Sequence, residues 1–228
     1  MPHAQLSRPV DWGLLTYAGV IGFQPTPTEW ESLARAADWR KGTDRFKAAY
    51  WSARREYDRG NLSTNAFWAR LGVRAKAAEL PARLDVAMWL RPDPRAVRAL
   101  ATARGRGTRL ALLCSAPVPL ARRLEATTWA RSLFERLIFS CDVGISMPQE
   151  EALARALVAI GVPHPRDGQV VVVDDREENC LRALAMGLDT HWYRGNPADL
   201  AGALRRPQTP QPPPGSRSPS TPPTRGHS

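Results

Sequence analysis

Hydrophobic residues along this chain fall into two alternating patterns, short unbroken apolar runs and longer stretches with apolar residues at helical spacing. The clearest unbroken run is the valine stretch 170–173, which is followed directly by Asp174 and Asp175. A short continuous run of this kind is typical of a strand buried on both faces of a sheet. After a polar turn at 176–179, apolar residues recur with helical spacing up to Gly187, a residue type that often ends helices. The pattern therefore predicts a strand that carries two acids at its carboxyl end and leads into a helix.

The same alternation extends over most of the chain. Further apolar runs predict strands at residues 12–17, 108–117, 137–140 and 190–195. Helical spacing follows or separates them at residues 92–104, 119–131, 149–160 and 197–205. Strands that alternate with helices are typical of βαβ units and hence of a parallel sheet. We therefore predict an α/β fold, a Rossmann-like parallel sheet flanked by helices.

Residues 25–89 interrupt this alternation, because they contain no convincing strand. Segments such as WESLARAADW and DRFKAAYWSARREYD carry apolar residues at helical spacing, and Ser63 or Thr64 can cap a helix that carries Phe67 and Trp68. We predict two to four helices here, forming a small all-helical cap inserted after the first strand. Most of its aromatic residues are expected to pack in a core, and the alternative is that a few line a substrate pocket.

The remaining segments give the domain organisation. We expect an α/β core made of residues 10–24 and 90–206, with the cap at 25–89. From Pro207 the sequence is rich in proline and almost free of large apolar residues. Such a segment cannot bury enough surface to offset the entropy of ordering, so 207–228 is expected to be a disordered tail.

Composition and charge narrow the class of protein further. Among 228 residues there are 3 cysteines, an odd number without metal-ligand spacing, which disfavours a disulfide framework or a zinc site. The amino terminus lacks the apolar core of a signal peptide, and no run of about 18 apolar residues occurs. We therefore expect a cytoplasmic protein without a membrane partner.

The formal net charge is +10, with 32 Lys and Arg residues against 22 Asp and Glu residues. The basic residues are scattered rather than clustered, so the sequence gives no support for nucleic-acid binding. A protein partner that binds the arginine-rich cap or the proline-rich tail remains an open possibility, and the sequence names none.

Chemistry is expected where the predicted strands end, because parallel sheets bind ligands at the carboxyl edge of their strands. The candidate residues at this edge are Thr16, Ala18, Cys114, Ser115, Met147, Asp174 and Asp175. Paired acids in such a position suit Mg²⁺, which takes oxygen ligands and often only one or two carboxylates. The alternative is that Asp174 and Asp175 belong to an ordinary turn and helix cap.

Five segments, in this order, resemble the motifs of one known family. They are DWGLLTYAGV, AYWSARREYDRGNLSTNAFWARLG, WLRPDPRAVRALATARGRGTRLALLCSAP, IFSCDVGISMPQEEAL and VVVVDDREENCLRALAMGLDTHWY. Their pattern and order resemble the haloacid dehalogenase-like (HAD) superfamily over about residues 10–195. Within it, the chain is similar to members with a small helical cap, in the phosphatase branch related to the N-terminal domain of soluble epoxide hydrolase.

The resemblance implies an activity whose residues are only partly present. Active members of the family use an aspartate after the first strand as nucleophile, and phosphatases often carry a second acid two positions later. In this chain these positions hold Thr16 and Ala18. The second motif, normally Ser or Thr followed by Asn, reads Cys114-Ser115, and the third-motif Lys or Arg is replaced by Met147. Of the catalytic positions, only the Mg²⁺-binding acids of the fourth motif, Asp174 and Asp175, match.

Two functional hypotheses follow from this partial match. The first is a pseudoenzyme of the HAD-like hydrolase fold, catalytically impaired or inactive and retained for binding or regulation, with Mg²⁺ bound weakly or not at all. The alternative is a Mg²⁺-dependent phosphatase with a rearranged site that acts on a small phosphorylated metabolite. It would use Asp174 and Asp175 together with Ser115 or Cys114, and Asp142 could help to bind the metal.

Overall fold

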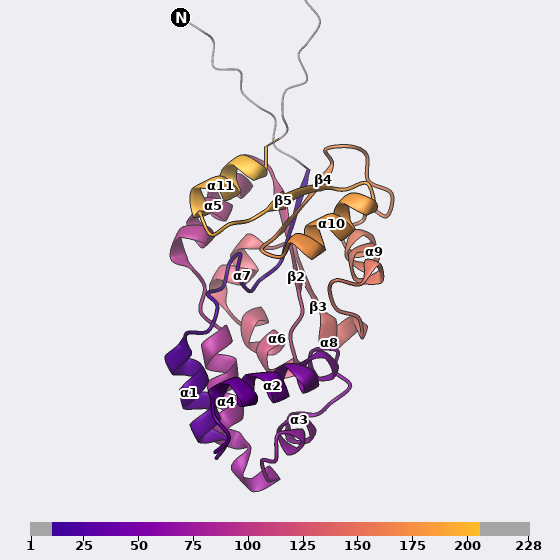
Figure 1. The fold of residues 1–228 in the computed structure, drawn as a ribbon. Coiled ribbons are helices and arrows are strands. Elements are labelled where there is room, and N and C mark those ends of the chain that lie inside the picture. Colours follow the sequence, from indigo (N-terminus) through magenta and orange to yellow (C-terminus); the bar gives the residue numbers. More distant parts are fainter. Residues whose placement is uncertain (1–10, 206–228) are drawn as a thin grey trace, which may run out of the picture.

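Five parallel strands form the centre of the structure, a computed structural model that describes residues 11–205 (Figure 1). The strands are β1 (Trp12–Leu15), β2 (Arg109–Cys114), β3 (Arg136–Phe139), β4 (Val170–Asp174) and β5 (Asp189–Trp192). Their order across the sheet is β3-β2-β1-β4-β5, and every neighbouring pair is parallel. The predicted α/β fold, a Rossmann-like parallel sheet flanked by helices, is confirmed.

The sheet is buried on both faces, as the valine run predicted. Alternate residues of a strand point to opposite faces, so Val171 and Val173 join one hydrophobic cluster while Val170 and Val172 join the other. Among the described residues, seven helices belong to the part of the chain that forms the sheet. They are α5 (Pro94–Gly105), α6 (Val118–Glu125), α7 (Thr128–Leu133), α8 (Ser140–Val143), α9 (Glu150–Ala159), α10 (Glu177–Ala185) and α11 (Pro197–Ala203). Helices α9 and α10 cover one face, and α5, α6, α7 and α11 cover the other.

The helical insert, residues 27–89, lies between β1 and α5. It consists of α1 (Pro27–Ala36), α2 (Thr43–Asp58), α3 (Thr64–Arg70), a 3₁₀ turn (Ala75–Ala77) and α4 (Glu79–Trp89). Ser63, one of the two residues predicted to cap α3, accepts a hydrogen bond from the backbone N–H of Ala66 at 3.2 Å. In Figure 1 the insert lies at the end of the molecule opposite α11.

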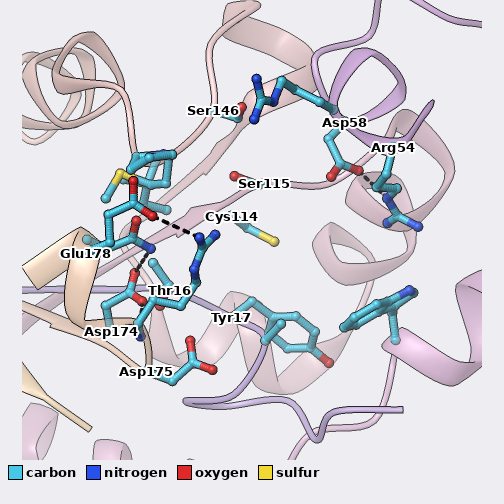
Figure 2. Close-up of a pocket in the computed structure, with 18 of the residues that line it drawn as sticks. Thr16, Tyr17, Arg54, Asp58, Cys114, Ser115, Ser146, Asp174, Asp175 and Glu178 are labelled. Atoms are coloured by element: carbon cyan, nitrogen blue, oxygen red, sulfur yellow. Dashed lines mark hydrogen bonds and ion pairs between the residues drawn. The ribbon is translucent and has the colours of Figure 1, made fainter. Parts of the chain in front are cut away.

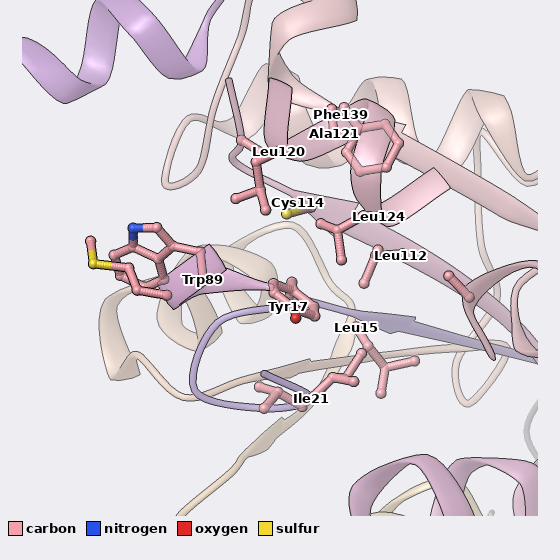
Figure 3. Close-up of a cluster of buried hydrophobic side chains, with 14 of the residues drawn as sticks. Leu15, Tyr17, Ile21, Trp89, Leu112, Cys114, Leu120, Ala121, Leu124 and Phe139 are labelled. Atoms are coloured by element: carbon pink, nitrogen blue, oxygen red, sulfur yellow. The ribbon is translucent and has the colours of Figure 1, made fainter. Parts of the chain in front are cut away.

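The aromatic residues of the insert are mostly buried, as their spacing predicted. The rings of Trp30 and Tyr50 meet edge to face with centroids 5.0 Å apart, and those of Tyr57 and Phe67 stack at 4.3 Å. Trp51 is the exception, since half of its surface is exposed. The insert and the sheet share one continuous hydrophobic cluster, part of which is drawn in Figure 3.

Two short segments join the insert to the sheet. They run side by side, because the N–H of Phe23 donates to the carbonyl of Arg91 at 2.9 Å and the N–H of Asp93 to that of Ile21 at 2.7 Å. A third connection forms where α2 ends, since the buried Ser140 hydroxyl donates to the carbonyl of Asp58. The insert is therefore fixed to the sheet at several points.

The predicted bounds differ from the structure at several places. The second strand ends at Cys114 rather than at residue 117, and the last strand ends at Trp192 rather than at residue 195. The first strand ends at Leu15 rather than at residue 17, because the chain turns at Tyr17, whose carbonyl accepts the N–H groups of Ile21 and Gly22. The helical stretch predicted at 119–131 is two helices, α6 and α7. Between them the hydroxyl of Thr127 donates to the carbonyl of Leu124 at 2.7 Å, a local bond that competes with helix continuation.

Some sequence predictions fall on segments without a structural description. The amino-terminal arm and the proline-rich tail at 207–228 lie outside the described residues. Within residues 11–205 no helix is both long and apolar enough to span a bilayer.

Candidate functional site

A cavity of about 390 Å³ lies where the carboxyl ends of the strands face the helical insert (Figure 2). All seven residues that the sequence proposed for a site contribute to its wall: Thr16, Ala18, Cys114, Ser115, Met147, Asp174 and Asp175. They meet there because β1, β2, β3 and β4, after which these residues lie in the chain, are parallel and end at the same edge. The insert and the segment after β4 contribute further wall residues, among them Trp51, Arg54, Arg55, Asp58, Arg176 and Glu178.

Asp174 holds the turn between β4 and α10. Its carboxylate is buried, and one oxygen accepts the backbone N–H of Arg176 at 2.8 Å while the other accepts the side-chain amide of Asn179 at 2.7 Å. Burial raises the pKa of Asp174 to about 6, and these two hydrogen bonds oppose that rise. Both oxygens thus have protein donors, which is the arrangement expected of the turn interpretation.

Asp175 is half-buried and lies nearer to the opening of the cavity. One carboxylate oxygen accepts a long hydrogen bond from Gln24 Nε2 at 3.4 Å, and burial raises the pKa of this carboxyl. Gly19 packs directly against it: a Cβ on Gly19, whose φ is +80°, would lie 1.9 Å from Asp175 Oδ2. Only glycine fits this position without displacing the acid.

Thr16 occupies the end of β1, where the family resemblance places the nucleophile. Its hydroxyl is partly buried and donates to the carbonyl of Val173 in β4 at 3.4 Å. Cys114 at the end of β2 is buried, and burial together with the nearby Asp58 raises the pKa of its thiol. A thiol that stays protonated at neutral pH is a poor nucleophile. Ser115 is exposed at the same strand end.

Met147 brings no charge to the cavity wall, and it packs against the cluster of α9 and α10. The cations of the cavity come from positions that the sequence analysis did not single out: Arg54, Arg55 and Arg176. Arg176 forms an ion pair with Glu178 at 3.1 Å, and both side chains are more than half exposed. Such a surface pair is weak, about 0–1 kcal/mol.

Arg54 of α2 is buried in the insert side of the cavity. Its Nε donates to Asp58 at 2.6 Å and its Nη1 to Asp85 at 3.0 Å. Tyr50 donates its hydroxyl to Asp85 at 2.5 Å and in turn accepts the indole N–H of Trp89 at 3.0 Å. Burial raises the pKa of Asp58 to about 6 and also raises that of Asp85, while Arg54 lowers both. The charge of Arg54 is therefore engaged by two carboxylates and is not free for a ligand.

The sequence contained a partial signal for this cluster. Arg54 and Asp58 are four residues apart, the spacing of an ion pair on one face of a helix. Nothing in the local sequence marked Asp85 as their partner, because it lies on a different helix.

The strand ends offer two acids, Asp174 and Asp175, to a magnesium ion. Within residues 11–205, no group of three or more His, Cys, Asp or Glu side chains is placed to hold a metal. Asp174 uses both oxygens for N–H donors. Asp142, which could have assisted, forms an ion pair with Arg122 and does not contribute to the described cavity wall.

Searches with the sequence found no match among protein-family models and none among curated proteins. Solved structures do match. A HAD family enzyme from Bacteroides thetaiotaomicron superposes with a TM-score of 0.67 at 13% identity, covering 82% of this chain and 95% of the other. The wild-type form of that enzyme, crystallised with magnesium and inorganic phosphate, gives a TM-score of 0.65 at 14% identity with the same coverage.

An L-2-haloacid dehalogenase from Xanthobacter autotrophicus, with chloropropionic acid covalently bound, is also similar. Its TM-score is 0.56 at 17% identity, and the match covers 79% of this chain and 76% of the dehalogenase. At these identities the similarity establishes the fold. The chain has the fold of HAD family hydrolases, as the resemblance of its motifs implied.

Proposed function

We propose that this HAD-fold protein is a pseudoenzyme, a non-catalytic member of the fold that serves a binding or regulatory role. In this proposal residues 25–89 act as a cap over a core formed by 10–24 and 90–206. The main support for this proposal is the residue that follows β1. Thr16 stands where the family resemblance places a nucleophilic carboxylate, and its hydroxyl donates to the carbonyl of Val173.

The neighbouring side chains do not compensate for this substitution. The Asp174 carboxyl beside Thr16 is held by two N–H donors, and the buried thiol of Cys114 has a raised pKa. Met147 stands where a cation would hold the phosphoryl oxygens, and losing one such contact typically lowers kcat by about 10²–10³-fold. Removing a nucleophile by itself typically lowers it by several orders of magnitude.

The cavity itself is retained, which supports a binding role. It keeps a half-exposed indole at Trp51, an exposed guanidinium at Arg55 and the half-buried carboxyl of Asp175. Polar groups that converge in a partly apolar cavity of this size are typical of small-molecule sites.

The proposal is tested by measuring hydrolysis of p-nitrophenyl phosphate and of a panel of small phosphorylated metabolites. Both assays contain Mg²⁺ or Mn²⁺. We expect no turnover above the rate without protein, and no change for Asp174→Ala. Calorimetric titration with Mg²⁺ should show no saturable heat.

Metal-dependent turnover at ordinary enzyme rates that Asp174→Ala abolishes would overturn the proposal. It would favour the alternative, a Mg²⁺-dependent phosphatase with a rearranged site that uses Asp174 and Asp175. Circular dichroism of the Asp174→Ala variant must first show a folded protein.

A further inference from the structure

A second concave surface lies away from the cavity, between the helical insert and α6. This α4–α6 groove has a volume of about 1050 Å³. Its apolar surface comes mainly from α4, with Pro119 of α6 on the opposite side: Ala78, Leu80, Ala82, Leu84, Val86, Ala87, Leu90 and Pro119. Leu80 is 54% exposed, a large fraction for leucine. Because one wall belongs to the insert and the other to the helices of the sheet, an occupant would contact both.

The charges around the groove are predominantly positive. Arg83 of α4 and Arg122 and Arg123 of α6 contribute to its wall, whereas Glu79 is the single acid among the described residues that do so. Arg122 is engaged by Glu125 at 3.0 Å and by Asp142. Arg83 and Arg123 are exposed and form no ion pair with any residue between 11 and 205. Two guanidinium groups that form no ion pair within residues 11–205 therefore flank an apolar floor, and Glu79 lies four residues before Arg83 on α4.

The apolar floor and the exposed arginines together indicate which kind of molecule the α4–α6 groove binds. No aromatic side chain contributes to the described groove wall, so it offers no stacking platform for nucleic-acid bases. The floor is concave, so a flat bilayer surface would not reach it. The carboxy-terminal segment 206–228 contains arginine and no acidic residue, so its charge has the same sign as that of the rim.

We propose that the α4–α6 groove binds an acidic amphipathic helix of a partner protein. Leucine-like side chains on one face of that helix fill the apolar floor, and flanking Asp or Glu residues pair with Arg83 and Arg123. Helix-in-groove recognition of this type uses apolar anchors at positions i, i+3, i+4 and i+7. The inference does not depend on whether the cavity at the strand ends is catalytic.

The test is a selection of displayed peptides of about 15 residues, long enough to form a helix, on the immobilised full-length protein. We expect enriched sequences with acidic residues and apolar residues at helical spacing. Fluorescence anisotropy then measures the affinity of a labelled enriched peptide. Arg83→Glu/Arg123→Glu should weaken binding by about tenfold or more, and added salt should weaken it as well.

Two controls separate the groove from general attraction to a basic protein. Arg155→Glu changes an exposed arginine of α9 that does not contribute to the groove, and it should alter the affinity by less than about twofold. A scrambled peptide of identical composition keeps the charge and loses the spacing, so it should bind at least about tenfold more weakly.

Several results would overturn the proposal. The selection could enrich no peptide beyond the level found on surfaces without protein, or it could enrich basic or unpatterned peptides. The enriched peptide could also bind the Arg83→Glu/Arg123→Glu variant as tightly as the wild-type protein. Displacement of the peptide by a single-stranded RNA oligonucleotide at lower concentration would favour nucleic acid instead. A dimer in sedimentation that the double variant converts to monomer would favour a second copy of this chain.

Discussion

At the scale of the residue, Asp174 shows how one side chain of a recognised motif also holds the local backbone turn. Its two oxygens are both used by N–H donors of the turn that follows β4. Its pKa lies above the usual range of an aspartate because it is buried. A raised pKa means that the folded protein keeps a proton that the unfolded chain has already released, so this residue makes stability fall as pH rises.

Asp174→Asn tests this dependence. In the wild-type protein the contribution of Asp174 to stability is fully present below about pH 4 and is lost as pH rises through about 6. The amide cannot ionise, so the difference in unfolding free energy between variant and wild type should shift in favour of the variant by roughly 2 kcal/mol between pH 4 and pH 7. Urea unfolding at several pH values measures it, and a difference that is flat with pH contradicts the assignment.

Thr16→Asp tests whether the acid that the family resemblance places at position 16 is the ligand that a magnesium site lacks here. A third carboxylate beside Asp174 and Asp175 completes a set of hard oxygen ligands, which Mg²⁺ prefers. We expect millimolar Mg²⁺ to raise the Tm of this variant by about 2–5 °C and to leave the wild type unchanged. Thr102→Asp on the exposed face of α5 is the matched control. An equal Mg²⁺-dependent shift in the wild-type protein would show that the present residues already bind the ion.

At the scale of the element, α2 combines a hydrophobic face with a buried charge. Phe46, Tyr50, Ala53 and Tyr57 recur at helical spacing and are buried, and Arg54 lies among them. Its guanidinium lies 5.2 Å from the ring centre of Tyr50 and bonds two acids. Taking one partner from a buried ion pair leaves an uncompensated charge, which is far more destabilising than losing a surface pair.

Arg54→Met should therefore destabilise the protein by about 3–5 kcal/mol at neutral pH. Arg55→Ala changes the next residue, which is exposed, and should alter stability by less than about 0.5 kcal/mol. The effect of Arg54→Met should shrink near pH 5, because Asp58, whose pKa burial raises to about 6, then takes up a proton and needs no partner. Thermal and urea unfolding at both pH values check this, and equal effects of the two substitutions would contradict it.

At the scale of the whole molecule, the insert and the sheet behave as one packing unit. A single hydrophobic cluster includes Tyr50 and Phe67 of the insert with Leu112 and Phe139 of the sheet. Ser140 adds a polar link, since its buried hydroxyl accepts the N–H of Ala116 at 2.9 Å and donates to the carbonyl of Asp58. We expect the described part of the chain to unfold in one cooperative transition.

Ser140→Ala leaves two buried backbone groups without their partner, so it should lower the unfolding free energy by about 2–4 kcal/mol. The whole transition should move to lower denaturant, whether it is followed by tryptophan fluorescence or by far-UV circular dichroism. Ser132→Ala removes an exposed hydroxyl that also donates to a backbone carbonyl, and it should have little effect. Separate transitions for the two probes would show that the insert unfolds independently.

Much of the fold and the location of the site were predictable from local patterns. The valine run, the Gly187 helix end and the Ser63 cap are properties of neighbouring residues, so they could be read directly. The strand-end residues could be grouped because parallel topology brings strand ends together. Arg176 and Asp85 could not be assigned to the site or to its supporting cluster, because their roles depend on side-chain direction and on contacts between distant elements.

The sequence alone determined the α/β fold, the helical segment after the first strand and the absence of an acid at position 16. These follow from hydrophobic periodicity and residue identity, which require no knowledge of distant contacts. The tertiary structure decided what the retained groups do. It placed N–H donors on both oxygens of Asp174, buried Arg54 between two acids and exposed Arg83 and Arg123 beside an apolar groove. Burial and partner geometry set the charge state and availability of a side chain, and both arise only when segments far apart in the sequence pack together.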